Sequence, residues 1–149
     1  MSGLRPHLEH GPETHLVSTN LVGGTLVEPD GVTGKVKPSI VSSTTVLGLA
    51  LGDAAATAGM QATTQDAWGR NYGGGLNPPN EVAVAYRGSW WLKNTSGGTL
   101  LYGVRLITGA AGSFAAAGAT PDARTIVGIV IEPGGIANNA EGRVRLTIR

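Results

Sequence analysis

Three histidines near the start of the chain have the clearest capacity for chemistry. His7, His10 and His15 lie within the first 20 residues, and imidazole is the commonest metal ligand in proteins. The chain has no cysteine, and no tight cluster of carboxylates accompanies the histidines. We therefore expect no metal site and no cofactor, and we interpret this segment as an extended arm.

Two carboxylates occupy matching positions and could form an acid–base pair. Asp53 follows the apolar run 45–51, and Glu132 follows the similar run 125–131. Facing carboxylates can perform general acid and base catalysis, but acidic residues are also common in turns. A Ser-His-Asp arrangement would require the arm to fold back, because every histidine precedes the core. We expect turn roles for both carboxylates, no catalytic residues and no enzymatic activity.

Two further motifs are weaker. The glycine-rich stretch Tyr72–Leu76 lacks the Lys-Ser/Thr ending of a phosphate-binding loop. The triplet Asn94–Ser96 fits the acceptor pattern for N-glycosylation. The N-terminal residues lack the apolar stretch of a secretion signal, so we expect this triplet to form a turn.

Composition favours a folded β-protein. Of the 149 residues, 41% are apolar, only 14% are charged and 24 are glycine, a mixture that disfavours helices. The formal net charge is +1 and the basic residues are scattered along the sequence, whereas nucleic-acid-binding proteins usually carry a dense basic face. No apolar run approaches the roughly 18 residues of a membrane span. We therefore expect neither a nucleic acid nor a membrane as partner.

The strands that must position these residues occur in two similar sets. The runs "TVLGLALGDA" (45–54) and "TIVGIVIEPG" (125–134) each carry a glycine in the middle of an apolar strand. In both sets a Gly-Gly-Thr-Leu stretch precedes the run, at 23–26 and 97–100, and an alternating strand follows it. This order predicts an internal duplication, with halves at about 21–93 and 97–149. The longer spacing in the first half predicts a loop insertion at about 54–80.

The two glycine-bearing strands predict how the halves close. A strand that is apolar on both faces lies deep in a barrel or sandwich, and a glycine inside a strand marks a bend, a bulge or close backbone approach. We expect Gly48 and Gly128 to form corners of a small β-barrel. The predicted fold is thus all-β, a β-barrel or β-tulip-like domain at 21–149 with an extended arm at 1–20. Any short helix should begin near Asp53.

The remaining candidates for function are surface residues. Trp90 and Trp91 are adjacent in a predicted strand, so one indole should face the core and the other the solvent. The long loop at 54–80 adds aromatic residues, and the arm adds apolar anchors that could extend a partner's sheet. The candidate interface residues are Leu4, Pro6, Leu8, Leu16, Val17, Trp68, Tyr72, Trp90 and Trp91.

The ending "VGIVIEPGGIANNAEGRVRL" (127–146), the two passes of strands and the arm resemble the capsid decoration, or head cement, proteins of tailed bacteriophages. The long insertion and the histidine-bearing arm depart from that family's pattern. The resemblance implies a β-barrel or β-tulip fold, with protomers often clustered as trimers on the outer surface of the virion head. It also implies a role in head stabilisation, in which each protomer clamps neighbouring copies of the major capsid protein.

Two other functions remain open at this stage. A tail, fibre or glycan-binding module for receptor attachment would use Trp68, Tyr72, Trp90 and Trp91 as a surface on which sugars stack. A cryptic enzyme is the remaining alternative. Exposure of the tryptophans as a platform would favour the receptor-binding module, and burial at a contact between protomers would favour the decoration protein.

Overall fold

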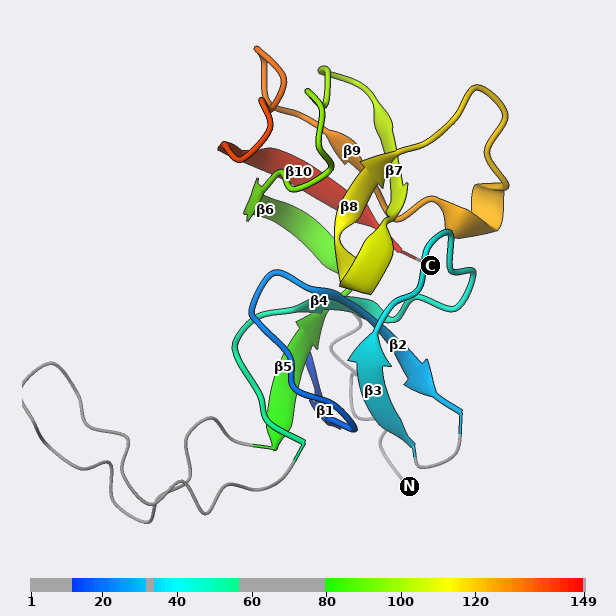
Figure 1. Cartoon of the computed structure of the whole chain (residues 1–149), viewed down its shortest axis with the longest axis vertical. Coiled ribbons are helices and arrows are strands. Elements are labelled where there is room, and N and C mark those ends of the chain that lie inside the picture. Colours follow the sequence, from blue (N-terminus) through cyan, green and yellow to red (C-terminus); the bar gives the residue numbers. More distant parts are fainter. Residues whose placement is uncertain (1–11, 32–33, 57–79, 149) are drawn as a thin grey trace, which may run out of the picture.

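The computed structural model describes residues 12–31, 34–56 and 80–148. In these ranges the chain forms two five-stranded antiparallel sheets and two short 3-10 turns, η2 (Ala110–Gly112) and η3 (Ala123–Thr125). The sheets form two lobes, one above the other in Figure 1. The prediction of an all-β fold is therefore confirmed.

The first sheet contains the first five strands in the spatial order β1-β5-β4-β2-β3. Its strands are β1 (Glu13–Leu16), β2 (Leu26–Asp30), β3 (Lys35–Pro38), β4 (Gly48–Ala50) and β5 (Glu81–Ala85). One face of this sheet is apolar and covers its own core, which includes Val27, Val36 and Val84.

The second sheet repeats this arrangement with the next five strands, in the order β6-β10-β9-β7-β8. Its strands are β6 (Arg87–Lys93), β7 (Arg105–Thr108), β8 (Phe114–Ala116), β9 (Gly128–Val130) and β10 (Glu141–Thr147). Because each strand occupies the same place in chain order and in the sheet, the predicted duplication into two similar halves is confirmed.

The hydrogen bonds show which residues of the two halves correspond. The Gly24 N–H donates to the Ala50 carbonyl at 2.8 Å, and the Gly103 N–H donates to the Val130 carbonyl at 2.9 Å. Gly48 therefore corresponds to Gly128, as the sequence predicts. The Gly-Gly-Thr-Leu stretches do not correspond, because Gly24 matches Gly103 rather than a glycine of the second stretch.

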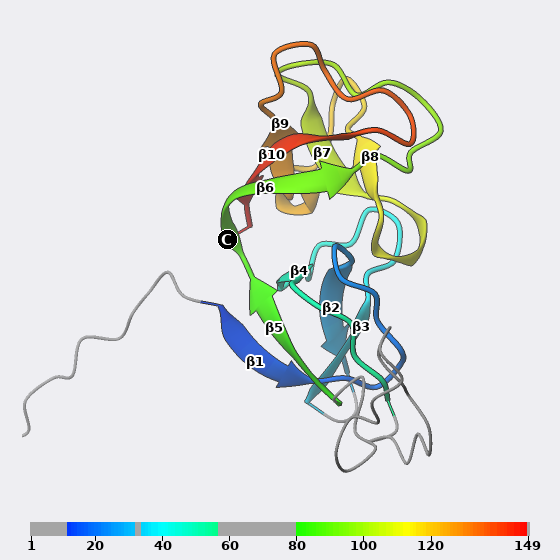
Figure 2. The ribbon, with the colours of Figure 1, turned by 90° about the vertical axis from the view of Figure 1, so that its left-hand side faces the viewer.

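The boundary between the halves lies at Tyr86, not between residues 93 and 97. The stretch 81–93 continues as two strands, of which β5 belongs to the first sheet and β6 to the second. Figure 2 shows the chain bending between them. On both sides of the bend the inward-facing residues are even-numbered: Val82, Val84, Trp90 and Leu92. The alternation of inward and outward residues is therefore unbroken, and the sequence gives no sign of the bend.

The predicted barrel is wrong, because both sheets are open. In the described part of the first sheet, the edge strands β1 and β3 form no continuous ladder; just after β1, Val17 bridges Val36 and the Ser18 N–H donates to the Val36 carbonyl at 2.9 Å. Gly48 and Gly128 do not form barrel corners; they allow the backbone of the neighbouring strand to approach closely. A Cβ at Gly48 would lie 2.5 Å from the Ala85 carbonyl oxygen. A Cβ at Gly128 would lie 2.7 Å from the corresponding carbonyl oxygen, on β10.

The predicted arm is shorter than expected. Strand β1 pairs with β5 in antiparallel register from Glu13 to Leu16, and Val17 is buried in the first core. Residues 13–17 therefore belong to the first sheet, with β1 as its edge strand and Val17 in its core. Residues 1–11 lie outside the described residues, as do 57–79 of the predicted insertion. No helix begins at Asp53, since Ala54 forms a β-bridge with Leu21.

The two lobes share apolar and polar contacts. Leu26 and Leu49 of the first sheet belong to the apolar cluster of the second sheet, which includes Leu106 and Phe114. Across the junction, the Gly112 N–H donates to the Ser39 carbonyl at 2.9 Å. The backbone N–H groups of Ser42 and Ser43 donate to the carbonyl and hydroxyl oxygens of Thr108 at 2.9 Å. These contacts fix one sheet against the other.

Candidate interaction surface

Trp90 and Trp91 point to opposite faces of β6, as the sequence predicts. Trp90 is half-buried against the second core, and its indole N–H donates to the Arg87 carbonyl at 3.0 Å. Trp91 is 66% exposed on the outer face of the second sheet. Because an exposed indole has apolar area available to a partner, Trp91 is the starting point of the candidate surface.

The other predicted interface residues are not gathered around Trp91. Leu16 is 43% exposed on β1, in the other lobe, whereas Val17 is 1% exposed and serves the first core. Val17 therefore stabilises the fold instead of facing a partner. The remaining five lie outside the described residues: Leu4, Pro6, Leu8, Trp68 and Tyr72.

Beside Trp91, hydrogen bonds to Glu132 hold the side chain of Arg143 in place. Trp91 pairs across the sheet with Arg143, whose guanidinium carbon lies 5.9 Å from the centre of the indole. The Arg143 backbone N–H and Nε both donate to the Glu132 carboxylate at 3.1 Å. The ion pair thus holds the arginine near the ring, and Trp91 still remains 66% exposed.

Around these residues the fold gathers charges that are scattered in the sequence. Residues opposite one another in a sheet, and residues two apart along a strand, share a face. Arg145 of β10 stands opposite Ser89 of β6 and Ile129 of β9, and Ile129 stands opposite Arg105 of β7. The outer face of the second sheet therefore carries five cations, which are Arg87, Lys93, Arg105, Arg143 and Arg145.

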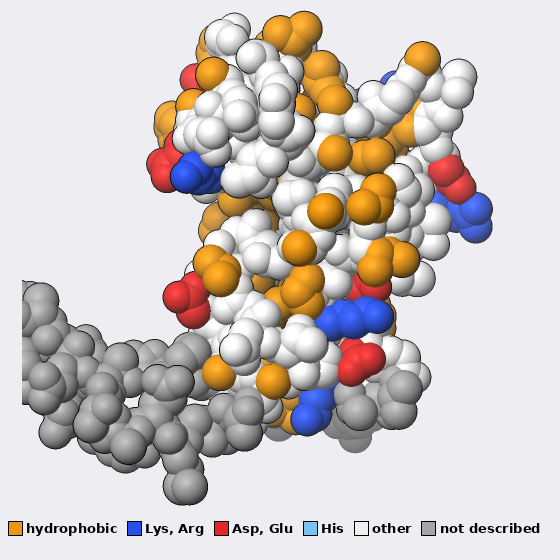
Figure 3. Space-filling model, viewed as in Figure 1, with side chains coloured by type: hydrophobic (Ala, Val, Ile, Leu, Met, Phe, Trp, Pro, Cys, Tyr) orange, Lys and Arg blue, Asp and Glu red, His pale blue; other side chains and the backbone are white. Residues whose placement is uncertain are grey.

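Two cations of this outer face border a shallow hollow. It has a volume of about 440 Å³, and its lining includes Arg87, Arg145 and Thr147 from the ends of β6 and β10. Arg87 also lies over the Tyr86 ring, 5.9 Å from its centre. A carboxylate or another oxyanion entering the hollow would meet two guanidinium groups with donors in fork geometry. By contrast, the side of the molecule in Figure 3 is largely uncharged along its middle.

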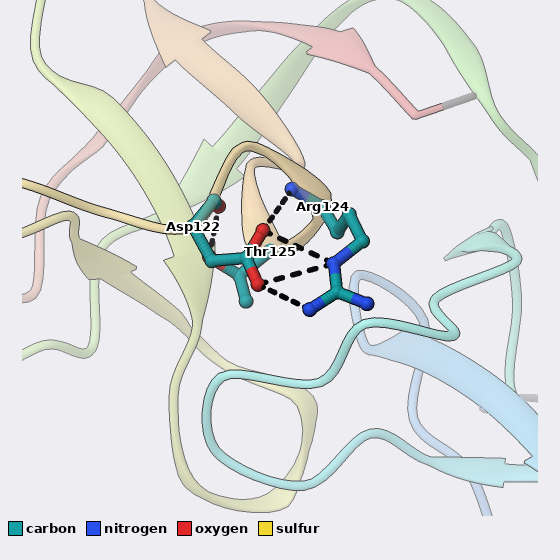
Figure 4. A network of polar contacts seen from close by, with 3 residues as sticks. All are labelled: Asp122, Arg124 and Thr125. Atoms are coloured by element: carbon teal, nitrogen blue, oxygen red, sulfur yellow. Dashed lines mark hydrogen bonds and ion pairs between the residues drawn. The ribbon is translucent and has the colours of Figure 1, made fainter.

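A second hollow lies between the lobes, and Arg105 of the outer face also lines it. It has a volume of about 430 Å³ and is lined by Val46 of the first lobe and by Arg124 and Ile148 of the second. Arg124 is tied to Asp122 by an ion pair at 2.7 Å, shown in Figure 4. Hydrogen bonds from the guanidinium lower the pKa of the Asp122 carboxyl. Asp122 also accepts from the Arg124 backbone N–H at the start of η3, so the pair holds a turn.

Of the residues considered first for chemistry, His7 and His10 lie outside the described residues, and the others have local partners. His15 lies 3.5 Å from the neighbouring carboxylate of Glu13. Asp53 accepts from the Gly23 N–H at 2.8 Å, so each carboxylate of the proposed acid pair has a local partner. Within residues 12–31, 34–56 and 80–148, no group of three His, Asp or Glu could hold a metal ion. No helix among them is long and apolar enough to span a membrane.

Asn94, of the glycosylation-like triplet, is a buried structural residue. Its amide Nδ2 donates to the carbonyls of Gly98 and Ile136 at 2.7 and 2.8 Å, and its Oδ1 accepts from the Ser96 N–H at 2.9 Å. The side chain thereby closes the turn after β6 against a distant loop. The expectation of a turn at this triplet is confirmed.

The sequence carries a signal for the basic face. In "GRVRLTIR" the arginines at 143 and 145 alternate with apolar residues. In "RGSWWLK" the residues Arg87, Trp91 and Lys93 are separated by even numbers of positions, so they lie on one face of a strand. This alternation predicts one wet face for each strand. Their adjacency could not be predicted, because it depends on β6 and β10 pairing while Arg105 arrives from β7.

Comparisons with known proteins give a likeness of fold. The sequence matches no protein-family model and no curated protein. The structure is similar to a solved one, the N base of head fiber gp8.5 in bacteriophage phi29. That likeness covers 91% of this chain and 92% of the other, with a TM-score of 0.57 and 14% sequence identity. At this identity the likeness shows a shared fold.

Proposed function

We propose that this chain is a structural protein of a tailed-phage virion that attaches to the head. The observation that carries the proposal is the fold, because the chain follows the base of a phage head fiber over nine-tenths of both lengths. A resemblance of sequence motifs pointed independently to a protein of the phage head. The two lines rest on different features, since one uses local motifs and the other uses the arrangement of both sheets.

The architecture is suited to such a role. Two sheets with the same topology share one apolar cluster and a hydrogen-bonded junction, which makes a stiff unit with a different outer face at each end. An attachment protein needs a rigid body and contact surfaces. Its attachment can be strong although each contact is weak, because many copies on one particle act at high effective concentration.

In its finer form, the proposal is that the chain decorates the outer surface of the head. There it would contact the major capsid protein and neighbouring copies of itself, as trimers, and would clamp the shell. No enzymatic activity, nucleic acid, membrane or cofactor is part of this role. The exposed Trp91 also favours a second candidate, a fibre base that carries a receptor- or glycan-binding module.

Fractionation of the virion tests the proposal. Purified particles of a phage that encodes this chain are disrupted and separated into heads and tails, and the chain is quantified in each fraction by mass spectrometry. The proposal predicts that it follows the major capsid protein in the head fraction, at many copies per particle. Its presence in tails alone, or in neither fraction, would refute attachment to the head.

Protease treatment of intact heads then separates the finer proposals. Decoration of the outer surface predicts that the chain is cut while the packaged DNA stays protected. Loss of the chain should lower the temperature at which heads release DNA if the chain clamps the shell. Unchanged DNA release with loss of adsorption to host cells would favour the receptor-binding fibre.

A further inference from the structure

We propose that the outer face of the second sheet, centred on Trp91, Arg143 and Arg145, docks onto a carboxylate-bearing protein surface. The inference rests on the proposed function for the location of that surface, which is the phage head. It is carried by three features of the face: its unneutralised charge, its place in the internal repeat, and its exposed tryptophan.

The cations of this outer face exceed the carboxylates available to neutralise them. Of the five, Arg143 forms an ion pair with Glu132, and Lys93 stands opposite Glu141 across the sheet. In the described part of the chain, no carboxylate lies within 4.0 Å of Arg105 or Arg145. Cations that share a sheet face raise the potential between them, so a partner's carboxylate would interact with several at once.

The internal repeat identifies the same face as a docking position. In the first sheet Leu26, Leu49 and Ala85 stand in one row across β2, β4 and β5, and all three are buried. Leu26 and Leu49 pack into the apolar cluster of the second lobe. This row is therefore the one that the first lobe uses to hold another unit of the same fold.

The corresponding row of the second sheet is Arg105, Ile129 and Arg145. The correspondence follows from the matched registers, since Leu49 beside Gly48 takes the place of Ile129 beside Gly128. The position is the same, but the two apolar side chains at its ends are replaced by exposed arginines. A neighbour that covers this row must supply acidic groups in place of apolar ones.

A protein surface fits this face better than a uniformly anionic polymer. Trp and Arg are the residues most enriched at the centres of protein interfaces, and here Trp91 is 66% exposed beside a fixed Arg143. The half-buried Ile129 adds apolar area to the centre of the face. Glu132, paired with Arg143, and Glu141, opposite Lys93, interrupt the positive charge, so the face suits a few placed carboxylates better than an unbroken chain of phosphates or a polyanionic glycan. A second copy presenting the same face would bring like charges together.

Single charge reversals test the proposal in a binding assay with purified heads from a phage strain that lacks this chain. Arg145→Glu alters the face, and the matched control Lys35→Glu makes the same change on β3 of the other lobe. Trp91→Ala has its control in Tyr102→Ala, because Tyr102 is 65% exposed but lies outside the face. All four residues are exposed or partly exposed, and circular dichroism with thermal melting verifies that each variant is folded.

We expect Arg145→Glu and Trp91→Ala each to weaken binding at least tenfold in about 0.1 M salt, and the controls to stay within twofold of the parent. The loss for Arg145→Glu should shrink as salt is raised, because exposed charges are screened over roughly 10 Å at 0.1 M. Soluble poly-glutamate should compete for the parent protein, and duplex DNA of equal charge concentration should compete less well.

The outcomes that contradict the proposals differ. If the parent protein fails to bind the heads, the proposed function is overturned and the inference falls with it. If the parent binds and the two face variants bind as their controls do, the inference alone is overturned. If duplex DNA or heparin competes better than poly-glutamate, the face is a site for polyanions and the acidic protein partner is rejected.

Discussion

Replacing Gly48 with alanine should destabilise the protein through a clash with the neighbouring strand. The added Cβ would lie 2.5 Å from the Ala85 carbonyl oxygen and 2.6 Å from Cγ1 of Val84, whereas ordinary contacts of this kind span 3.4–4 Å. The carbonyl is backbone, so it cannot rotate away as a side chain could. Strands β4 and β5 must therefore move apart by nearly 1 Å where Leu49 and Ala85 stand opposite each other.

The magnitude follows from the cost of overpacking. Strained insertions of this size cost about 1–3 kcal/mol, while Gly→Ala substitutions that fit gain about 0.4–1 kcal/mol from the unfolded chain. We expect Gly48→Ala to lower the free energy of unfolding by about 1–3 kcal/mol, and Tm by about 2–4 °C for each kcal/mol. Gly128→Ala should cost less, because its Cβ would meet only the Arg145 carbonyl oxygen at under 3.0 Å.

Urea unfolding and thermal unfolding, both followed by circular dichroism, measure these differences. The control is Gly52→Ala, because a Cβ at Gly52 would meet nothing within 4 Å and should leave stability within about 0.5 kcal/mol of the parent. If Gly48→Ala and Gly52→Ala unfold at the same temperature and urea concentration, close approach is not the reason for the glycine, and the explanation of the repeated strand is refuted.

Three further predictions concern the edge strand, a buried amide and an exposed ion pair. Deleting residues 2–17 removes β1 and buried Val17, and calorimetry should show a loss of about 2–5 kcal/mol; an unchanged Tm would mean that β1 is dispensable. Asn94→Ala leaves two carbonyls without a donor and should cost about 2–4 kcal/mol in urea unfolding; a cost below 0.5 kcal/mol on that scale would contradict it. The pKa of Asp122 is lowered mainly by hydrogen bonds from Arg124, so their stabilisation is complete above its ordinary pKa and is lost as the pH falls through the lower folded-state pKa. In NMR titrations the Asp122 midpoint should rise in Arg124→Gln, and an unmoved midpoint would refute the ion pair.

Local sequence patterns predicted the class of fold and its repeat, because strand periodicity is a property of neighbouring residues. The correspondence of Gly48 with Gly128 was readable for that reason. The open sheets were not, because closure depends on whether β1 meets β3, and those strands are far apart in the chain. The bend at Tyr86 was not predicted because even-numbered residues face inward on both sides of it.

Of the candidate surface, the sequence predicted only that one of the two adjacent tryptophans faces outward. Alternation within β6 places Trp90 and Trp91 on opposite faces, but it cannot say which strand lies alongside. Arg105 and Arg145 are forty residues apart in the sequence and meet through Ile129 of β9. Val17 was misread as an anchor for the same reason, because the core that covers it is built from β3 and β5.

Electron cryo-microscopy of the intact virion tests the central proposal most directly. The proposal predicts density for the two-lobed fold on the outside of the head, with the outer face of the second sheet, around Trp91 and Arg145, set against acidic residues of a head protein. Density for this fold only on the tail, or no such density on the particle, would contradict the account.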